Sequence, residues 1–172
     1  MANLFSIVCK ANNLAIDLKH LLPRNLNNGD QVYVDNWAPP PAAGIFELQK
    51  WELLDLPSIG GAPGTEGWCA IRSWFNPMFY LNAEVSLSGE QPGRKVQIWM
   101  FDEAAIRNAA ENWWRFELAE ARYYRIRQWT EGGNEGGGMI LNAEGPNPQP
   151  WNKVQLYPQT GGDNELWRLE PA

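Results

Sequence analysis

The chain has 172 residues, a length that suits a single domain with a substantial core. Its 14 Lys and Arg against 20 Asp and Glu give a formal net charge of -6, which argues against a nucleic-acid partner because a phosphate backbone attracts clustered basic residues. Apolar runs are only a few residues long, so the sequence predicts no membrane insertion. The ten Trp are the unusual part of the composition.

The amino-terminal stretch MANLFSIVCKANN has no basic start followed by a long apolar run, so it predicts no secretory signal. We therefore expect a cytoplasmic protein. Cys9 and Cys69 are the two cysteines and His20 is the one histidine, too few for a disulfide framework or a zinc-type ligand set. The sequence thus predicts free thiols and no metal or other cofactor.

Short apolar runs separated by Gly, Pro and Asn clusters follow one another along the chain, a pattern typical of short strands joined by turns. In the first third these runs are FSIVCK, LAIDL, QVYVD and QKWELL. Next come WCAIRSW, YLNAE, KVQIW and WWRFEL, and then YYRIRQW, ILNAE, KVQLY and LWRLEP. The shared order predicts three repeats, at about residues 1–55, 56–119 and 120–172.

Each repeat is expected to contribute four strands, which in the third are Tyr123 to Trp129, Met139 to Ala143, Lys153 to Tyr157 and Leu166 to Leu169. The Ala-rich segment Phe101 to Trp114 favours one or two turns of helix. One four-stranded unit cannot bury its own apolar face, whereas three units around a pseudo-threefold axis can close into a barrel capped by hairpins. We therefore predict an all-β protein, a β-trefoil of twelve strands, in one domain spanning residues 1–172.

The ends of the three repeats resemble those of the ricin B-type lectin family, whose β-trefoil repeats close with a QxW signature. The first copy reads Gln49-Lys50-Trp51, a literal match. The other two read Asn112-Trp113-Trp114 and Glu165-Leu166-Trp167, altered at the first position. The resemblance implies that Trp51, Trp114 and Trp167 belong to the hydrophobic core, where a buried indole stabilises the fold.

The resemblance also implies where a sugar would bind. In this family the ligand groups are an acidic residue after the apolar residue of the second strand, a Gln-x-aromatic on the third strand, and an amide just before the closing Trp. The third repeat supplies Asn142, Gln155, Tyr157, Asn164 and Glu165. The second supplies Asn82, Gln97, Trp99 and Asn112. The first supplies Asp17, Tyr33, Asp35 and Gln49, with Trp37 two residues beyond the place of the family's aromatic.

Each of these residues also has a structural alternative. Gln97 and Gln155 could satisfy backbone groups at a strand end. Trp99 and Tyr157 could be ordinary packing aromatics, and Asn82 and Asn142 could serve a turn that tolerates left-handed geometry. Asn in place of the family's carboxylate also weakens the expectation of galactose-type specificity, because a neutral amide is the weaker acceptor.

No catalytic motif is apparent, so we expect a binding protein whose partners are glycans or glycoproteins. Surface aromatics would also suit a homodimer interface. One alternative is a protease inhibitor that presents the proline-rich loop Asn36 to Gly44, because the same scaffold serves in such inhibitors. Another is a protein-interaction or toxin-targeting module whose sugar sites have decayed.

Overall fold

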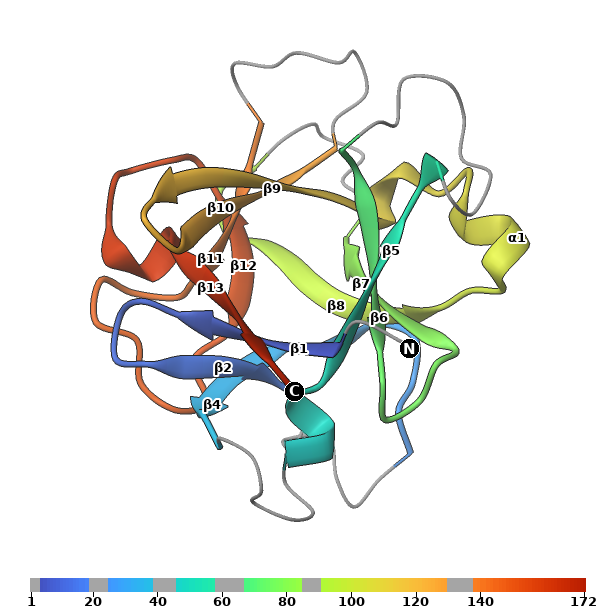
Figure 1. The fold of residues 1–172 in the computed structure, drawn as a ribbon, viewed down its shortest axis with the longest axis horizontal. Coiled ribbons are helices and arrows are strands. Elements are labelled where there is room, and N and C mark those ends of the chain that lie inside the picture. Colours follow the sequence, from blue (N-terminus) through green and yellow to red (C-terminus); the bar gives the residue numbers. More distant parts are fainter. Residues whose placement is uncertain (1–3, 19–24, 39–45, 58–66, 85–90, 130–137) are drawn as a thin grey trace.

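The computed structural model describes residues 4–18, 25–38, 46–57, 67–84, 91–129 and 138–172 (Figure 1). His20 and residues 39–45 of the proline-rich loop lie outside these ranges. Within them, no group of three or more His, Cys, Asp or Glu is placed to hold a metal ion. The helices found there are all too short or too polar to cross a membrane.

The strands follow the order of the three predicted repeats. The first repeat contains β1 (Leu4–Cys9), β2 (Leu14–Asp17), β3 (Asp30–Gln31), β4 (Tyr33–Asn36) and β5 (Trp51–Asp55). The second contains β6 (Cys69–Ser73), β7 (Phe79–Ala83), β8 (Arg94–Met100) and β9 (Trp113–Glu120). The third contains β10 (Tyr123–Gln128), β11 (Ile140–Ala143), β12 (Val154–Tyr157) and β13 (Trp167–Pro171).

The described strands number thirteen, one more than predicted, because the third strand of the first repeat is divided at Val32. The Val32 N–H donates to the Val96 carbonyl at 3.0 Å, and the Val32 carbonyl accepts from the Val154 N–H at 2.9 Å. Val32 thus pairs with two different repeats at once, so no single ladder runs through it.

Short helical segments precede each closing Trp. The Ala-rich segment contains α1 (Glu103–Ile106) and the 3-10 helix η4 (Ala110–Asn112), as predicted. Asp102 begins α1 by accepting the Ala105 N–H at 2.6 Å, an N-terminal cap. In the other repeats the corresponding turns are η2 (Phe46–Gln49) and η5 (Asp163–Glu165).

Six strands close into a barrel. β1 pairs with β13 and β5, β5 with β6, β6 with β9, β9 with β10, and β10 with β13, all antiparallel. The ring has no free edge, because each strand has a neighbour on both sides. These are the first and fourth strands of the three repeats, so each repeat contributes equally to the barrel.

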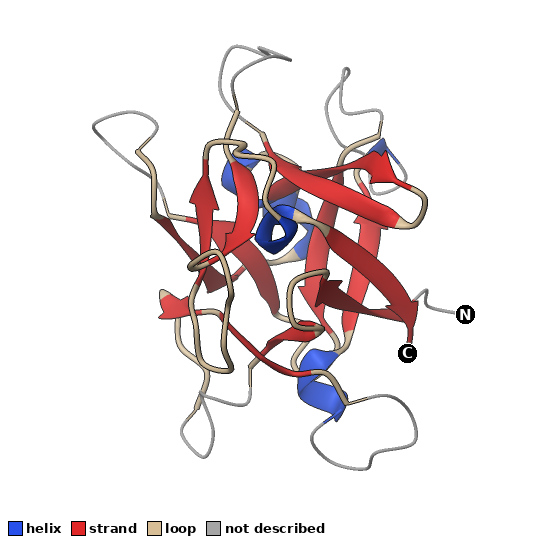
Figure 2. Cartoon of the chain, turned by 90° about the vertical axis from the view of Figure 1, so that its left-hand side faces the viewer, coloured by secondary structure: helices blue, strands red, loops and turns tan. Residues whose placement is uncertain are grey.

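The hairpins β2–β4, β7–β8 and β11–β12 make the cap (Figures 1 and 2). They meet through their third strands, since β8 pairs with β3 and with β12, and Tyr33 forms a bridge with Lys153. The β-trefoil prediction is confirmed by this arrangement of a closed barrel and three capping hairpins.

One side chain joins all three repeats where the third strands meet. The Gln31 amide lies within 2.8 Å of the carbonyl oxygens of Val32, Val96 and Val154, which are equivalent residues of the three repeats. The counterparts of Gln31 are Lys95 and Lys153. Gln31 therefore lies at the pseudo-threefold axis.

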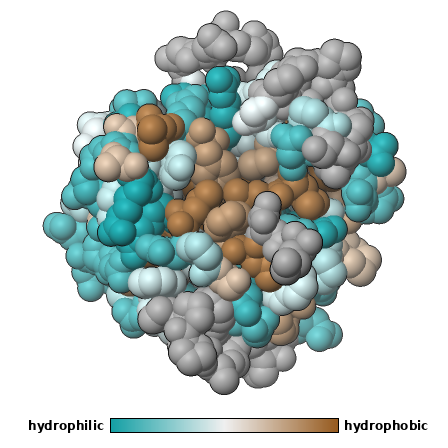
Figure 3. All heavy atoms as spheres, in the orientation of Figure 1, coloured by the Kyte–Doolittle hydropathy of each residue, from teal (hydrophilic) through white to brown (hydrophobic). Residues whose placement is uncertain are grey.

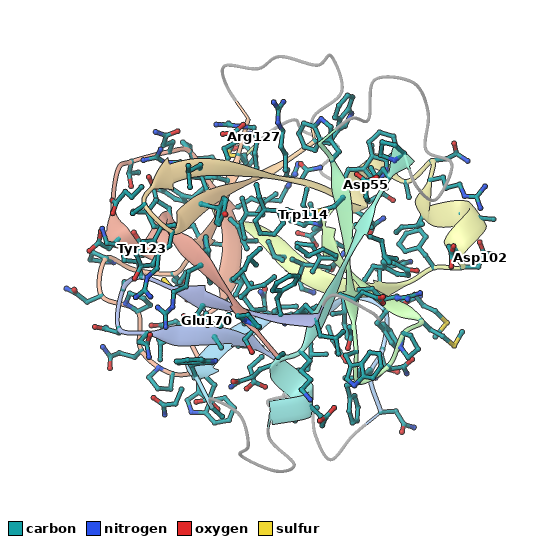
Figure 4. The ribbon with its side chains drawn as sticks, in the orientation of Figure 1. Asp55, Asp102, Trp114, Tyr123, Arg127 and Glu170 are labelled. Atoms are coloured by element: carbon teal, nitrogen blue, oxygen red, sulfur yellow. The ribbon has the colours of Figure 1, made fainter. Side chains whose placement is uncertain are left out.

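The closing Trp residues occupy the same environment in each repeat. Trp51, Trp114 and Trp167 are all fully buried, and Figure 4 shows Trp114 in the middle of the molecule. Their indole N–H groups donate to equivalent second-strand carbonyls, of Ile16 at 3.2 Å, Leu81 at 3.0 Å and Leu141 at 2.9 Å. The expectation that these residues form the core is confirmed.

The second repeat has an additional small core of its own. Tyr80, Ile106 and Trp113 are buried together with Leu56, Trp68 and Ala70, and Phe101 packs on them. This cluster anchors the segment that contains α1 and η4 against the outside of the barrel. Figure 3 shows hydrophobic residues gathered in the middle of one face, with hydrophilic residues around them.

Both cysteines are free thiols, Cys9 buried and Cys69 half-buried. Burial raises the pKa of each thiol to about 12 from an ordinary value of 9.0. The prediction of free thiols is confirmed, and both lie on barrel strands as small apolar residues.

Candidate functional site

The hairpins of the cap carry the predicted site residues in matching register. Asp17 pairs with Tyr33, Asn82 with Gln97, and Asn142 with Gln155. Two residues further along the third strand come Asp35, Trp99 and Tyr157. The sequence comparison of the repeats therefore agrees with the register of the pairs.

In the third repeat these residues line a depression of about 400 Å³. Its lining consists of Asn142, Gly145, Pro146, Gln155, Tyr157, Thr160, Gly162 and Asn164. Tyr157 is 36% exposed, whereas Asn142 is only 3% exposed. The depression thus combines an accessible aromatic ring with inward-facing amides.

Hydrogen bonds fix the amides of this depression. The Gln155 amide donates to Asn142 Oδ1 at 3.2 Å, and the Asn164 amide donates to the Ala143 carbonyl at 2.9 Å. A Cβ on Gly162 would lie 2.5 Å from Asn164 Oδ1, so Gly162 leaves room for the Asn164 side chain in this position. The Asn164 side chain is therefore held in one position at the wall.

Glu165, also predicted as a site residue, lies under the depression and is fully buried. Its carboxylate accepts the N–H groups of Thr160 and Gly161 at 2.8 and 2.6 Å, and Arg125 lies 3.7 Å away. Because Thr160 lines the depression, Glu165 shapes its wall from behind.

A second depression, of about 560 Å³, lies in the second repeat. Its lining consists of Gly29, Asn82, Glu84, Lys95, Gln97, Trp99, Phe101 and Glu111. The Gln97 amide donates to Asn82 Oδ1 at 2.8 Å, as Gln155 does to Asn142. Trp99 is 38% exposed, so this depression also has an accessible aromatic wall.

The predicted residue Asn112 lies beneath this second depression and is fully buried. Its Oδ1 accepts from the Asn82 amide at 3.1 Å, so it positions Asn82. Glu111 lines the depression, at the place that Asn164 has in the third repeat. Sequence reasoning missed Glu111, although both residues stand three positions before a closing Trp.

Phe101 and Glu111 come from the two ends of the segment that contains α1 and η4. This segment therefore adds a wall that carries a second ring and a carboxylate. Glu84 and Lys95 complete the rim, and the Lys95 ammonium donates to the Gly29 carbonyl. The second depression is accordingly the larger and the more charged of the two.

The first repeat brings its polar residues together but displaces its aromatic. The Gln49 amide donates to Asp17 Oδ2 at 2.5 Å, and Gln49 Oε1 accepts the Ala38 N–H at 3.0 Å. Asp35 accepts the Asn36 N–H at 2.7 Å. Trp37 lies instead under the Arg168 guanidinium, 5.2 Å from the ring centre, and lines neither depression.

Two of the structural alternatives are wrong. Asn82 and Asn142 lie inside β7 and β11, and neither is among the described residues with positive φ, so they serve no left-handed turn. Gln97 and Gln155 donate to Asn side chains, not to a strand end. Trp99 and Tyr157 are exposed at the rims, as a role in binding would require.

No protein-family model and no curated protein sequence matches this chain. Solved structures do resemble it along its whole length. A designed threefold-symmetric protein, ThreeFoil, has a TM-score of 0.73 at 19% identity, covering 98% of this chain and 99% of its own. A ricin B-like lectin of Macrolepiota procera has a TM-score of 0.64 at 17% identity, covering 98% of this chain and 95% of its own.

The Rhizoctonia solani agglutinin has a TM-score of 0.69 at 14% identity, with 100% of this chain and 96% of its own covered. These TM-scores show a shared fold, and at identities below 20% the ligand must be argued from the site. Over its full length, the chain has the β-trefoil fold found in ricin B-like lectins.

Proposed function

We propose that this protein is a carbohydrate-binding lectin and that the depression of the third repeat binds a glycan. The observation that carries the proposal is the gathering of Tyr157, Asn142, Gln155 and Asn164 around one shallow depression. The proposed activity is binding, without catalysis.

The chemistry of this depression suits a sugar ring. A hexose offers a patch of C–H groups on one side and hydroxyl groups around its rim. The exposed Tyr157 ring can pack on the C–H patch, while amide groups donate to and accept from hydroxyls. The amides of Asn142 and Gln155 are already oriented by their mutual hydrogen bond, which lowers the entropy lost on binding.

The depression of the second repeat supports a second glycan site. It repeats the Asn–Gln pair and the exposed aromatic, with Trp99 in place of Tyr157. Lectins with the same fold add support: the Macrolepiota procera protein was solved in complex with lactose. Two shallow sites on one molecule would raise avidity for glycans presented at a surface.

A glycan array probed with the folded protein is the direct test. We expect binding to a defined subset of glycans, weakened about tenfold by Tyr157→Ala, because a packed ring contributes on that scale. Asn142→Ala should act in the same direction. Phe75→Ala is the matched control, since Phe75 is 45% exposed and lines neither depression. An empty array, or equal binding by all variants, would refute the proposal.

A further inference from the structure

Trp151 has a backbone conformation that a bulky residue rarely adopts. Its φ is +76°, and its counterparts in the other repeats are glycines, Gly29 at +86° and Gly93 at +80°. These three residues each stand two positions before Gln31 or one of its counterparts, Lys95 and Lys153. Left-handed geometry favours Gly and is unfavourable for a residue with a Cβ, so a Trp here needs an explanation.

The backbone places the three residues equivalently. Each donates its N–H to the third strand of the following repeat: Gly29 to Ile98 at 3.0 Å, Gly93 to Leu156 at 2.9 Å, and Trp151 to Val34 at 2.7 Å. Trp151 of the third repeat therefore stands beside the third strand of the first repeat.

The direction of a side chain at this position follows from the glycines. A Cβ on Gly29 would lie 3.7 Å from Gln97 Oε1 and 3.8 Å from the Trp99 ring. A Cβ on Gly93 would lie 3.6 Å from Gln155 Oε1. Gln97, Trp99 and Gln155 all line the two depressions. By the same geometry, the Trp151 side chain leaves the backbone toward Tyr33 and Asp35, their counterparts in the first repeat.

The first repeat lacks an aromatic side chain at the position where the other two repeats have one. Asp35 occupies the position of Trp99 and Tyr157, and Trp37 packs under Arg168 instead. Its polar groups are buried to the same degree as those that line the two depressions: Asp17 and Asp35 are 2% and 5% exposed, against 3% for Asn82 and 5% for Gln97. The Trp151 side chain is 47% exposed, so half of it stays open to a ligand.

We infer that Trp151 supplies, from the third repeat, the aromatic wall of a third glycan site in the first repeat. Asp17 and Asp35 provide carboxylate acceptors for sugar hydroxyls in that site, where the other repeats have Asn82 or Asn142 and an aromatic. The site therefore favours a ligand that donates several hydroxyl hydrogen bonds. This inference rests on the proposed function.

The test uses the double variant Asn82→Ala/Asn142→Ala, which weakens the two sites already described, so that the first repeat contributes most of the remaining glycan binding. We expect this protein to keep part of the glycan binding of the unsubstituted chain. Adding Trp151→Gly, which suits the left-handed backbone, should weaken the residual binding about tenfold or more. Trp151→Phe, which keeps a ring, should preserve most of it.

Trp74→Gly in the same background is the matched control, since Trp74 is exposed to 45% and lines neither described depression. It should leave residual binding unchanged, and thermal denaturation should show that every variant is folded. Residual binding that is absent in the double variant, unaffected by Trp151→Gly, or increased by it would overturn the inference. Absence of glycan binding by the unsubstituted protein would instead refute the proposed function.

Discussion

The buried Trp layer and the rims of the cap follow the threefold repeat to very different degrees. Trp51, Trp114 and Trp167 are all fully buried and donate to equivalent carbonyls. At the rims, the equivalent positions hold Asp35, Trp99 and Tyr157. Close packing restricts what a core position accepts, whereas the rim positions differ in both residue and burial: Trp99 and Tyr157 are 38% and 36% exposed, and Asp35 is 5% exposed. Ligand preference should therefore differ between repeats that share one core.

Replacing a closing Trp should produce the largest effect. Trp167→Ala removes a fully buried indole and its hydrogen bond, and should lower the free energy of unfolding by about 3–5 kcal/mol. Urea denaturation of Trp51→Ala, Trp114→Ala and Trp167→Ala would compare the three positions. A loss below about 1 kcal/mol at one of them would show that the layer is not equivalent.

The axis should be the next most sensitive position. Gln31→Ala removes the amide that lies within 2.8 Å of three carbonyls, and should cost about 1–3 kcal/mol of unfolding free energy. The control is Gln159→Ala, because Gln159 is exposed. Equal stability of the two variants in urea denaturation would contradict the role of Gln31.

Rim substitutions should separate binding from folding. Trp99→Ala and Tyr157→Ala should each weaken binding of the glycans selected by their own repeat about tenfold, with little change in stability. Isothermal titration with array-selected glycans, alongside urea denaturation, would measure both. If either variant weakened binding of every glycan equally, the two depressions would not act as separate sites.

An exchange of wall residues would sharpen the difference between these depressions. Glu111→Asn gives the second repeat the residue that the third has at Asn164, and should shift its glycan preference a few-fold toward that of the third. The reciprocal Asn164→Glu should shift the third the other way. Glycan arrays would measure the shift of Glu111→Asn in an Asn142→Ala background and that of Asn164→Glu in an Asn82→Ala background. Unchanged preferences would show that this wall does not select the ligand.

The smallest effect should come from the thiols. Burial raises the pKa of Cys9 and Cys69 to about 12, so the folded state keeps both protonated while the unfolded state releases protons from about pH 9. Their contribution to stability is therefore fully present below pH 9 and is lost as pH rises toward 12. Thiol alkylation of the folded protein should be slow at pH 8, and rapid labelling would contradict the burial.

The sequence allowed prediction of the strands, the closing Trp residues and most of the polar rim. Apolar periodicity and Trp spacing depend on packing that each repeat must satisfy, so they leave a pattern in the residues. Glu111 escaped prediction because its role depends on how η4 turns the chain ahead of Trp114. The role of Trp151 was not predicted because Trp151 lies beside the third strand of the first repeat. That strand is far away in the sequence and comes near only where the third strands of the three repeats meet.

The position of Gln31 on the axis limits which residue a designed protein with three identical repeats can have there. A point on a rotation axis has room for one side chain, so three identical copies of any repeat would direct three side chains at one place. Three glutamines would compete for the same three carbonyls, and three lysines would bring like charges together. This chain resolves the conflict with one Gln31 and with Lys95 donating to Gly29 instead. A symmetrised version should therefore carry a small residue at this position in every copy.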